Sequence, residues 1–423
     1  MRVISKKWIF ENLNSSSKVN TNITATVRNI IEDIKKNKDV ALLKYVKKFE
    51  NKKANLNNIT IPQKTLKKAY SSLSYETKKS LKLAYKRIFY YHSKQKKLSY
   101  SFKDQLDSKF HIHWNPIENV GLYIPGGLAS YPSTVLMTAI PAKIAKVPNI
   151  MICVPSKNGQ TSNLTLAAAY LCGVKKVYNV GGAQAIAALA FGTKLIKKAD
   201  KVFGPGNQFV AEAKKQLFGV IGIDLPAGPS EVLVIANDKS NPSWIAYDLL
   251  AQGEHDPNAK TYVVAKNKNI LLNVKKELQK IMKEKKLKNV DQSIKNHCFL
   301  ILAKSKNEIY EISNFIAPEH LHLHERFNKN TLKKIVNAGS VFFGEKSPVA
   351  LGDYTIGTNH VLPTDQTAKF SSGLGVEDFI KKTVFIEPGN KTLKKIAEPT
   401  INLARQEGLE AHALSVEIRK IKS

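Results

Sequence analysis

From Val120 onward, short apolar stretches alternate with alanine-rich stretches, and this alternation constrains the fold more than any other feature of the chain. Residues 150–154 and 176–180 have the composition of buried strands, whereas residues 164–171 have that of a helix. Glycine turns such as Gly181-Gly182 connect a strand to the helix that follows it. Strand, turn and helix in succession predict parallel βαβ units with right-handed crossovers. The sequence therefore predicts an α/β protein.

The same alternation resumes after Ser230. We expect further strands at residues 231–236, 261–265, 299–303 and 340–343. Asn241 followed by Pro242 is a suitable beginning for the helix after the first of these strands. Ser305 and Glu308 have the spacing of a capping box, which predicts the start of another helix. A second set of βαβ units is therefore expected in this half of the chain.

Three regions depart from the alternation. Residues 1–115 have the pattern of helices with polar faces, interrupted near residues 57–62. The tail from Asp378 is predicted to be a small helical unit. Residues 344–374 form a long irregular segment rich in Gly, Pro, Thr and Asp, and such segments in compact domains are more often functional than idle.

Length and composition favour an ordinary globular protein. A chain of 423 residues is long enough for two or three domains, and 43% of its residues are hydrophobic. No stretch reaches the roughly 18 continuous apolar residues that a membrane helix requires. The first 17 residues lack the apolar centre of a signal peptide. We therefore expect a cytoplasmic protein that does not associate with a membrane.

The net charge of +32 raises the alternative of a nucleic-acid-binding protein. Of the 66 basic residues, however, only six are arginines and 60 are lysines. Arginine is the residue preferred for forked recognition of phosphates and bases, and the lysines are spread over the expected helices. A solvated cationic surface is the favoured interpretation, with weak, salt-sensitive binding to polyanions and no specific nucleic-acid partner.

Cysteine chemistry is not expected. The chain has three cysteines, without the spacing of a metal site. Cys153 and Cys172 lie in apolar surroundings and are predicted to be buried small hydrophobic residues.

The most informative motif is the run from Ala317 to Leu321, in which Glu319 and His320 stand next to each other after Pro318. A carboxylate and an imidazole can both move protons near neutral pH if neighbours shift the carboxyl pKa. Alone, the pair is more often solvated than catalytic. Four further segments, in chain order, also carry an acid, amide or imidazole near a glycine or proline: residues 252–255, 351–354, 359–363 and 407–412.

Gln252 and His255 are spaced to lie on one side of a helix. With a remote aspartate and histidine they could bind a divalent metal, although a helix end with a surface histidine is the simpler alternative.

Glycine turns at strand ends suggest a nucleotide site. The chain has neither the G-x-G-x-x-G nor the P-loop pattern. Its turns at residues 126–127, 181–182 and 204–206 nevertheless fall where open α/β sheets bind ligands, although such turns are often purely structural. Tyr123, Gln184 and Asn207 are the side chains best placed to contact a nucleotide from these turns.

Together these motifs resemble the histidinol dehydrogenase family. The resemblance rests on residues 121–127, 181–185, 204–207 and 226–231 and on the five acid, amide or imidazole segments, and covers nearly the whole chain in order. The chain differs from the family at Gly253, Lys369 and the Asp365-Gln366 turn, where the family has alanine, arginine and glycine-rich sequence.

The resemblance implies two Rossmann-like parallel-sheet domains with small N- and C-terminal helical extensions, in an intertwined homodimer. The implied divisions are an N-terminal extension at 1–20, a metal and substrate domain formed by 21–122 with 231–377, an NAD-binding domain at 123–230, and a C-terminal unit at 378–423. The C-terminal unit is expected to reach into the partner subunit's active site.

The resemblance also implies the reaction and its residues. The family oxidises L-histidinol to L-histidine through the aldehyde, in the last steps of histidine biosynthesis, and consumes two NAD+ with one Zn2+ per subunit. The implied metal ligands are Gln252, His255, Asp353 and His412. The proton-transfer pair is Glu319 and His320, and the cofactor contacts are Tyr123, Gln184 and Asn207. Besides the metal ligands, the implied substrate contacts are Ser230, His320, His360 and Glu407.

The chemistry of the residues agrees with these roles. His320 has a reference pKa of ~6.5, which suits it to take the hydroxyl proton of an alcohol. Glu319 suits activation of water in the aldehyde step, provided that burial raises its pKa. The substrate's imidazole and amine are metal ligands, so zinc can position it. The main alternative within enzymes is a paralogous zinc- and NAD-dependent dehydrogenase of another small amino alcohol or polyol. Outside enzymes, the alternative is a basic nucleic-acid-binding protein on a dehydrogenase scaffold.

Overall fold

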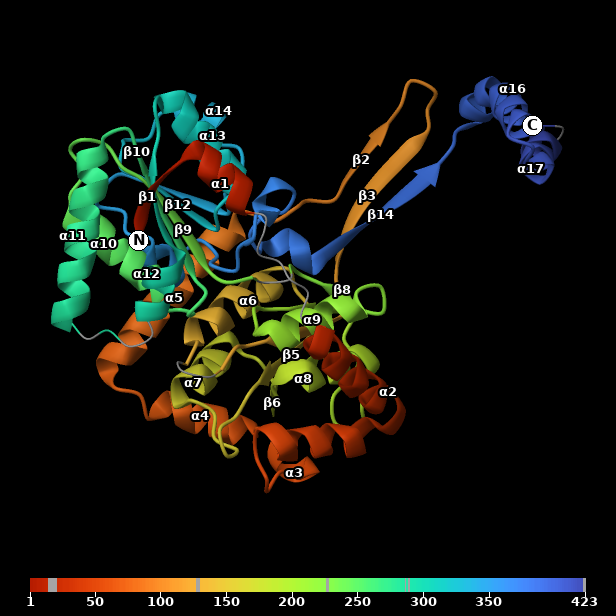
Figure 1. Ribbon diagram of the computed structural model, residues 1–423. Helices are drawn as coiled ribbons and strands as arrows, with labels where there is room; N and C mark the ends of the chain where they lie inside the picture. The colour runs from red at the N-terminus through yellow and green to blue at the C-terminus, as the bar shows by residue number, and fades with distance from the viewer. Residues whose placement is uncertain (14–20, 127–129, 226–227, 286, 288–289, 421–423) are drawn as a thin grey trace.

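The computed structural model describes residues 1–13, 21–126, 130–225, 228–285, 287 and 290–420. Gly127, Pro226 and Ala227 of the motifs above lie outside these residues. The described chain contains two parallel sheets and one smaller antiparallel sheet, flanked by helices (Figure 1). The predicted α/β class with parallel sheets is therefore confirmed. None of the described helices combines the length and apolar character needed to cross a membrane.

The larger sheet has six parallel strands in the order β1-β11-β10-β9-β12-β13. Its strands are β1 (Arg2–Ser5), β9 (Glu231–Ile235), β10 (Lys260–Ala265), β11 (Cys298–Leu302), β12 (His320–Leu323) and β13 (Ser340–Phe343). One face packs on α10 (Pro242–Gly253), α11 (Lys268–Lys285) and α12 (Val290–His297). The other face packs on α1 (Lys6–Asn12) and α13 (Lys306–Ile316). The short helices α14 (Lys329–Lys334) and α15 (Ala350–Tyr354) follow β12 and β13.

The smaller parallel sheet has five strands in the order β6-β5-β4-β7-β8. They are β4 (Asn119–Tyr123), β5 (Asn149–Val154), β6 (Lys176–Asn179), β7 (Lys201–Phe203) and β8 (Gly222–Ile223). One face is covered by α6 (Pro132–Ile144) and α7 (Asn163–Cys172), and the other by α8 (Gly182–Phe191) and α9 (Gln208–Leu217).

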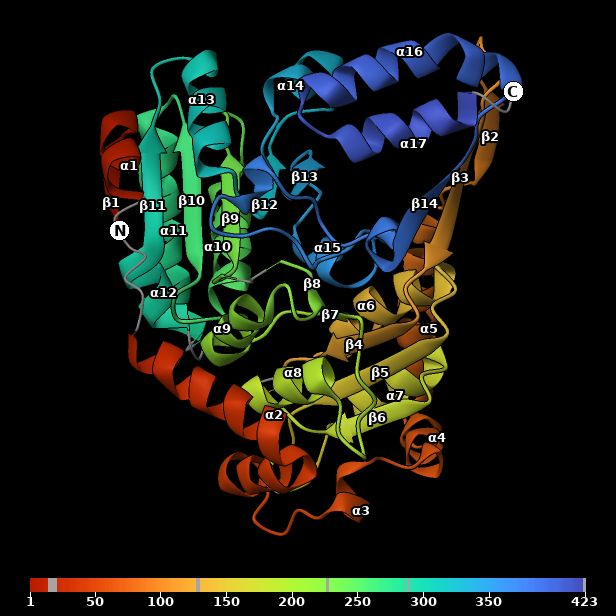
Figure 2. The same cartoon turned by 90° about the vertical axis from the view of Figure 1, so that its right-hand side faces the viewer.

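The helices between residues 21 and 93 pack against the helices and strands of this smaller sheet, whereas α1 lies on the larger sheet. The helix α2 (Thr21–Phe49) lies on α8 and α9 (Figure 2). The short helix α3 (Leu56–Ile59) connects α2 to α4 (Gln63–Ser71), which lies on α7. The next helix, α5 (Tyr75–Ser93), lies on α6. We expected residues 21–122 to accompany residues 231–377, so this packing differs from that assignment. The apolar faces of these helices are buried among the alanine-rich helices of the smaller sheet, which accounts for the difference.

The N-terminal segment also differs from expectation, because β1 is an edge strand of the larger sheet, paired with β11. We had placed it in a separate extension of residues 1–20. Part of that segment, residues 14–20, lies outside the described residues.

The third sheet is an antiparallel arm that projects from the body (Figure 1). It contains β2 (Tyr100–Lys103), β3 (Lys109–Pro116) and β14 (Ile380–Glu387), followed by α16 (Asn390–Gln406) and α17 (Glu410–Lys420). The prediction of helices alone was wrong here, both before residue 115 and after residue 378. All residues of β14 from Lys381 to Glu387 are exposed, so the strand lacks the half-buried alternation by which a sequence reveals a strand.

The predicted strands and helices of the two parallel sheets are otherwise confirmed, with ends that shift by only a few residues. Asn241 caps α10, and the Ser305 side chain accepts a hydrogen bond from the Glu308 N–H as a helix cap. The irregular segment 344–374 contains α15 and the 3-10 turn Thr367–Lys369, and a second 3-10 turn, Val376–Phe379, precedes the arm. The strand β12 was not predicted, although it begins with His320 of the Glu319–His320 motif.

Candidate active site

Glu319 and His320 lie where the chain enters β12, a strand inside the larger sheet. Ala317 ends α13 in the left-handed conformation with φ 47°, and Pro318 then directs the chain into the strand. A side chain at Gly339 could not be accommodated, because its Cβ would lie 2.5 Å from the carbonyl oxygen of Glu319. The turn and this glycine together hold the pair at the amino edge of the sheet.

Glu319 is buried, with 7% of its surface exposed. Its Oε2 accepts a hydrogen bond of 2.8 Å from the backbone N–H of Glu231 on the adjacent strand β9. Burial raises the pKa of Glu319 well above its ordinary value, and the nearby carboxylates of Glu231 and Asp353 raise it further, while the N–H opposes the shift. The condition that we set for a water-activating carboxyl is therefore met.

His320 is also buried, and its Nδ1 lies 3.3 Å from the carbonyl oxygen of Glu231 and 3.7 Å from Oε2 of Glu319. Because a carbonyl can only accept, Nδ1 carries the hydrogen and Nε2 keeps a lone pair. Burial lowers the pKa of His320 to about 3, and the imidazoles of His360 and His255 contribute to the shift. The ring is thus neutral at pH 7 and can accept a proton.

Three of the four expected metal ligands lie in the part of the molecule that also carries Glu319 and His320. Gln252 is buried near the end of α10, and His255 follows that helix. Desolvation lowers the pKa of His255, and burial raises the pKa of Asp353 on α15 to about 7. His255 influences the pKa of His320, and Asp353 that of Glu319, so the ligands and the proton-transfer pair share one electrostatic environment. An imidazole and a carboxylate are usual donors for zinc, whereas the amide oxygen of a glutamine is an uncommon one.

His360 connects this group to the smaller sheet. Its Nδ1 lies 3.1 Å from the carbonyl oxygen of Asp353, and its Nε2 lies 3.3 Å from the hydroxyl of Thr134 on α6. Burial, with a smaller contribution from His255, lowers the pKa of His360 to about 4, although the hydrogen bond to the Asp353 carbonyl opposes the shift. Ser230 immediately precedes β9, at the same sheet edge as Glu319.

The remaining candidates, Glu407 and His412, lie elsewhere in the chain. Glu407 follows α16 and His412 is on α17, and both are exposed. In Figure 1 these two helices stand beyond the tip of the arm, well separated from the larger sheet. Within one chain, the structure therefore does not bring Glu407 and His412 to Glu319 and His320.

The three expected cofactor contacts lie at the carboxyl edge of the smaller sheet. Tyr123 ends β4, and its buried hydroxyl accepts a hydrogen bond of 3.1 Å from the N–H of Gly182. The Gln184 amide is also buried and donates to Glu50 at 3.1 Å. Asn207 is exposed and caps α9. Two of these side chains thus have internal hydrogen bonds that shape the turn at Gly181-Gly182.

The sequence did not point to Glu50, which follows α2. Its carboxylate accepts hydrogen bonds from the N–H groups of Ser156 and Gly181, at 3.0 and 2.8 Å, as well as from Gln184. Burial raises its pKa, although these hydrogen bonds oppose the shift. The side chain fixes two turns at the expected nucleotide site. No local pattern could have revealed it, because its partners are more than 100 residues away.

A buried ion pair supports the neighbouring glycine turn. Lys214, on α9, pairs with Asp224 and donates to the carbonyl oxygens of Gly204 and Leu225, at 3.0 and 3.2 Å. Asp224 in turn accepts a hydrogen bond of 2.6 Å from the N–H of Gly204. Lys214 is 1% exposed, so this ion pair is buried in the protein.

The turn that departs from the family pattern has a glycine-like backbone. Asp365 and Gln366 have φ angles of 49° and 66°, which non-glycine residues rarely adopt. Asp365 pairs with Lys260 at 2.6 Å, and Lys260 also lies 3.4 Å from the buried Glu231. This pairing holds the turn near the start of β9, where the Glu319 contact is made.

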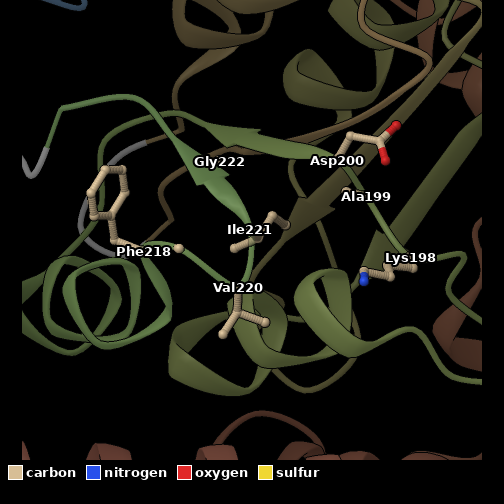
Figure 3. A pocket seen from close by; sticks show the side chains of 8 residues that line it. Lys198, Ala199, Asp200, Phe218, Val220, Ile221 and Gly222 are labelled. Carbon is tan, nitrogen blue, oxygen red and sulfur yellow. The ribbon is translucent and has the colours of Figure 1, made fainter. Parts of the chain in front are cut away.

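An open pocket of about 270 Å³ lies outside this region (Figure 3). It is lined by residues that precede β7 and β8, including Asp200, Phe218 and Val220. These residues are at the amino edge of the smaller sheet, opposite the glycine turns, so the pocket is not part of the candidate active site. Cys153 and Cys172 are buried as predicted, Cys298 is buried as well, and burial raises the pKa of each thiol.

Two parallel sheets flanked by helices, with a buried acid–imidazole pair at the edge of one of them, define an α/β protein with a candidate site for proton transfer. The histidinol dehydrogenase family model matches residues 13–420. A histidinol dehydrogenase of Acinetobacter baylyi is 42% identical over 418 residues, which are 98% of this chain and 97% of the relative. One of Prochlorococcus marinus subsp. pastoris is 45% identical over 402 residues, with 95% and 94% of the two chains covered.

The solved structures agree with the sequences. The crystal structure of a histidinol dehydrogenase from Elizabethkingia anophelis matches with a TM-score of 0.92 and 36% identity, covering 100% of this chain and 98% of that one. The chain therefore belongs to the histidinol dehydrogenase family. It is an NAD-dependent oxidoreductase, and the resemblance seen in the sequence is confirmed.

Proposed function

We propose that this chain oxidises L-histidinol to L-histidine through L-histidinal, transferring two hydrides in succession to two NAD+. The observation that carries the proposal is the pairing of Glu319 and His320, both buried, at one sheet edge. Each oxidation releases a proton, first from the alcohol and then from the water that adds to the aldehyde. Each step needs a positioned proton acceptor, and the pair supplies one for each.

His320 is proposed to take the alcohol proton on Nε2, the nitrogen that faces away from the Glu231 carbonyl. Its pKa of about 3 makes this transfer unfavourable in the isolated chain. A nearby negative charge would favour the protonated ring, and Glu407 of the partner subunit could provide it. Glu319, whose pKa is raised, is proposed to take the proton of the attacking water.

The metal ligands are proposed to be Gln252, His255 and Asp353 with His412 of the partner subunit. Their imidazole and carboxylate donors suit zinc, which when bound would hold the imidazole and amine of the substrate in place. Ser230, His360 and Glu407 of the partner subunit are the further proposed substrate contacts. Tyr123, Gln184 and Asn207 are the proposed NAD contacts, at the edge where α/β sheets bind nucleotides.

A homodimer with shared active sites is proposed because the C-terminal unit has exposed apolar surface. On β14, Phe385 is 54% and Ile386 63% exposed, and Leu403 and Ile418 on the following helices are 63% and 61% exposed. Large apolar side chains left exposed in such number on one unit are typical of an interface. A second copy of the chain is the proposed occupant, since Glu407 and His412 then reach a site that their own chain leaves incomplete. A cytoplasmic location remains a prediction.

The test is NADH formation by purified protein with L-histidinol, compared with a polyol and with amino alcohols that lack the imidazole. We expect about two NADH per L-histidine formed, and loss of turnover after chelation that added Zn2+ restores. Comparable turnover of the other alcohols would instead favour a dehydrogenase of different specificity. Absence of turnover with any of them, in zinc-loaded dimeric protein, would refute the proposal.

A further inference from the structure

Three potential metal ligands lie together apart from the proposed active site. They are Asp248 on α10, His322 on β12 and His324 just after that strand. One ligand atom from each side chain lies within 4.8 Å of the other two. Side chains alternate along a strand, so His322 faces the same side of the sheet as His320 and lies further from the amino edge. The cluster therefore occupies the carboxyl end of β12, whereas the catalytic pair occupies its amino end.

The hydrogen bonds of His322 are those of a metal ligand. Its Nε2 lies 2.9 Å from the carbonyl oxygen of Gly344, so Nε2 carries a hydrogen and donates it. Metal-binding histidines commonly donate their second N–H to a backbone carbonyl in this way. Its Nδ1 then faces Oδ2 of Asp248 at 2.9 Å. A lone pair and a carboxylate at this distance repel each other unless a proton or a metal ion stands between them.

The surroundings of His324 distinguish a proton between His322 and Asp248 from a metal ion between them. His324 is 3% exposed, yet neither of its ring nitrogens has a hydrogen-bond partner among the described residues. Its ring centroid lies 4.5 Å from that of His322. An unpaired buried polar group costs about 1–3 kcal/mol. A proton on His322 would satisfy Asp248 and His322 but would leave both nitrogens of His324 unpaired. A shared metal ion gives a partner to Asp248, to His322 and to one ring nitrogen of His324.

The protonation of His324 is compatible with metal binding. Burial and, to a smaller extent, the neighbouring His322 ring together lower the pKa of His324 to about 3. The ring is therefore neutral at pH 7 and retains the lone pair that a ligand needs.

We propose that Asp248, His322 and His324 bind a divalent transition-metal ion of the zinc class, at a second site separate from the catalytic one. Two imidazoles and one carboxylate are suitable ligands for Zn2+ and Co2+, and water can complete the coordination. Asp248 precedes Gln252 by one helical turn, so both lie on the same side of α10. The bound ion joins α10 to β12 and fixes the helix that carries Gln252. Its role is structural.

Metal content after complete removal and reloading with Zn2+ tests this proposal. Wild-type protein should retain about two Zn2+ per chain, and His324→Gln about one with most of the dehydrogenase activity kept. Asp353→Asn should also retain about one, but without activity. His297→Gln, which removes a histidine outside the cluster, should retain both ions. About one Zn2+ per chain in wild type, unchanged in His324→Gln, would overturn the proposal.

The Asp353→Asn variant lacks a ligand of the proposed catalytic metal site but leaves the Asp248–His322–His324 cluster unchanged. Metal binding to the cluster can therefore be measured by itself in this variant. Added Co2+ should give the visible absorption of a nitrogen- and oxygen-coordinated ion, and should raise the unfolding temperature. Asp248→Asn in the same background should remove both effects. If Co2+ produces neither effect in Asp353→Asn, the cluster does not bind metal. The Co2+ measurement does not depend on histidinol turnover. A failure of the proposed function would be detected separately, by the assay of NADH formation.

Discussion

Glu319 accepts a hydrogen bond from the backbone N–H of Glu231 at 2.8 Å, across two neighbouring strands of the larger sheet. The contact fixes the carboxyl group beside His320, in surroundings that raise its pKa. Because the donor is backbone, it cannot be lost by a change of the Glu231 side chain. The position of the proposed water-activating group is thus set by the sheet itself.

Glu319→Gln should slow aldehyde oxidation much more than alcohol oxidation, because the amide keeps the hydrogen bond but cannot take a proton. Loss of a general base typically costs about 10²- to 10⁴-fold. Rates with supplied L-histidinal and with L-histidinol in a single turnover separate the two steps. Equal losses at both steps would contradict the assigned division of roles.

Aldehyde oxidation should accelerate as pH rises. Glu319 must be ionised to act as a base, and its raised pKa means that most carboxyl groups are still protonated above the ordinary range of a glutamate. The rate should increase about tenfold per pH unit below this pKa and level off above it. Glu319→Gln should lack this rise. If the same slope persists in the variant, another group is responsible.

Lys214→Met should destabilise the protein by about 3–5 kcal/mol, since it leaves Asp224 charged and buried without its partner. Lys215→Met is the matched control, because Lys215 lies on the same helix and is exposed. Urea unfolding of the two variants measures the difference. A free energy of unfolding for Lys214→Met equal to that of the control would show that the pair has little influence on stability.

His412→Asn should lower zinc content while leaving thermal stability nearly unchanged. The side chain is exposed on α17 and forms no hydrogen bond among the described residues, so its loss should not disturb the fold. Ser415→Ala, on the same helix, should retain wild-type zinc. Metal analysis after dialysis compares the two, and full zinc content in His412→Asn would exclude that residue as a ligand.

The core of the fold was readable from the sequence because the strands and helices of both parallel sheets carry their own signals. The strand β12 could not be predicted from the sequence, because its residues alternate histidine with Leu321 and Leu323. Buried strands of parallel sheets usually have aliphatic residues on both faces. The arm was missed because its apolar residues, such as Phe385 and Ile386, are more than half exposed and do not follow the alternation of a half-buried strand.

The candidate site shows a similar division. The Glu319–His320 pair was found because its two members are adjacent, and the family resemblance then supplied residues such as Asp353. Contacts that depend on the folded chain were invisible. Glu50 meets Gly181 across 131 positions, and Lys260 meets Asp365 across 105. The Asp248–His322–His324 cluster also requires the packing of α10 on the sheet, although His322 and His324 themselves are only two residues apart.

The most direct test of the shared active site uses mixed dimers, with Glu319→Gln in one chain and His412→Asn in the other. If each site takes its acid–imidazole pair from one chain and His412 from the partner subunit, one site of the dimer contains both changes and the other contains neither. Dimers purified through two different tags should then recover about half of the wild-type activity, whereas each parent variant should be nearly inactive. Mixed dimers as inactive as their parents would contradict the account.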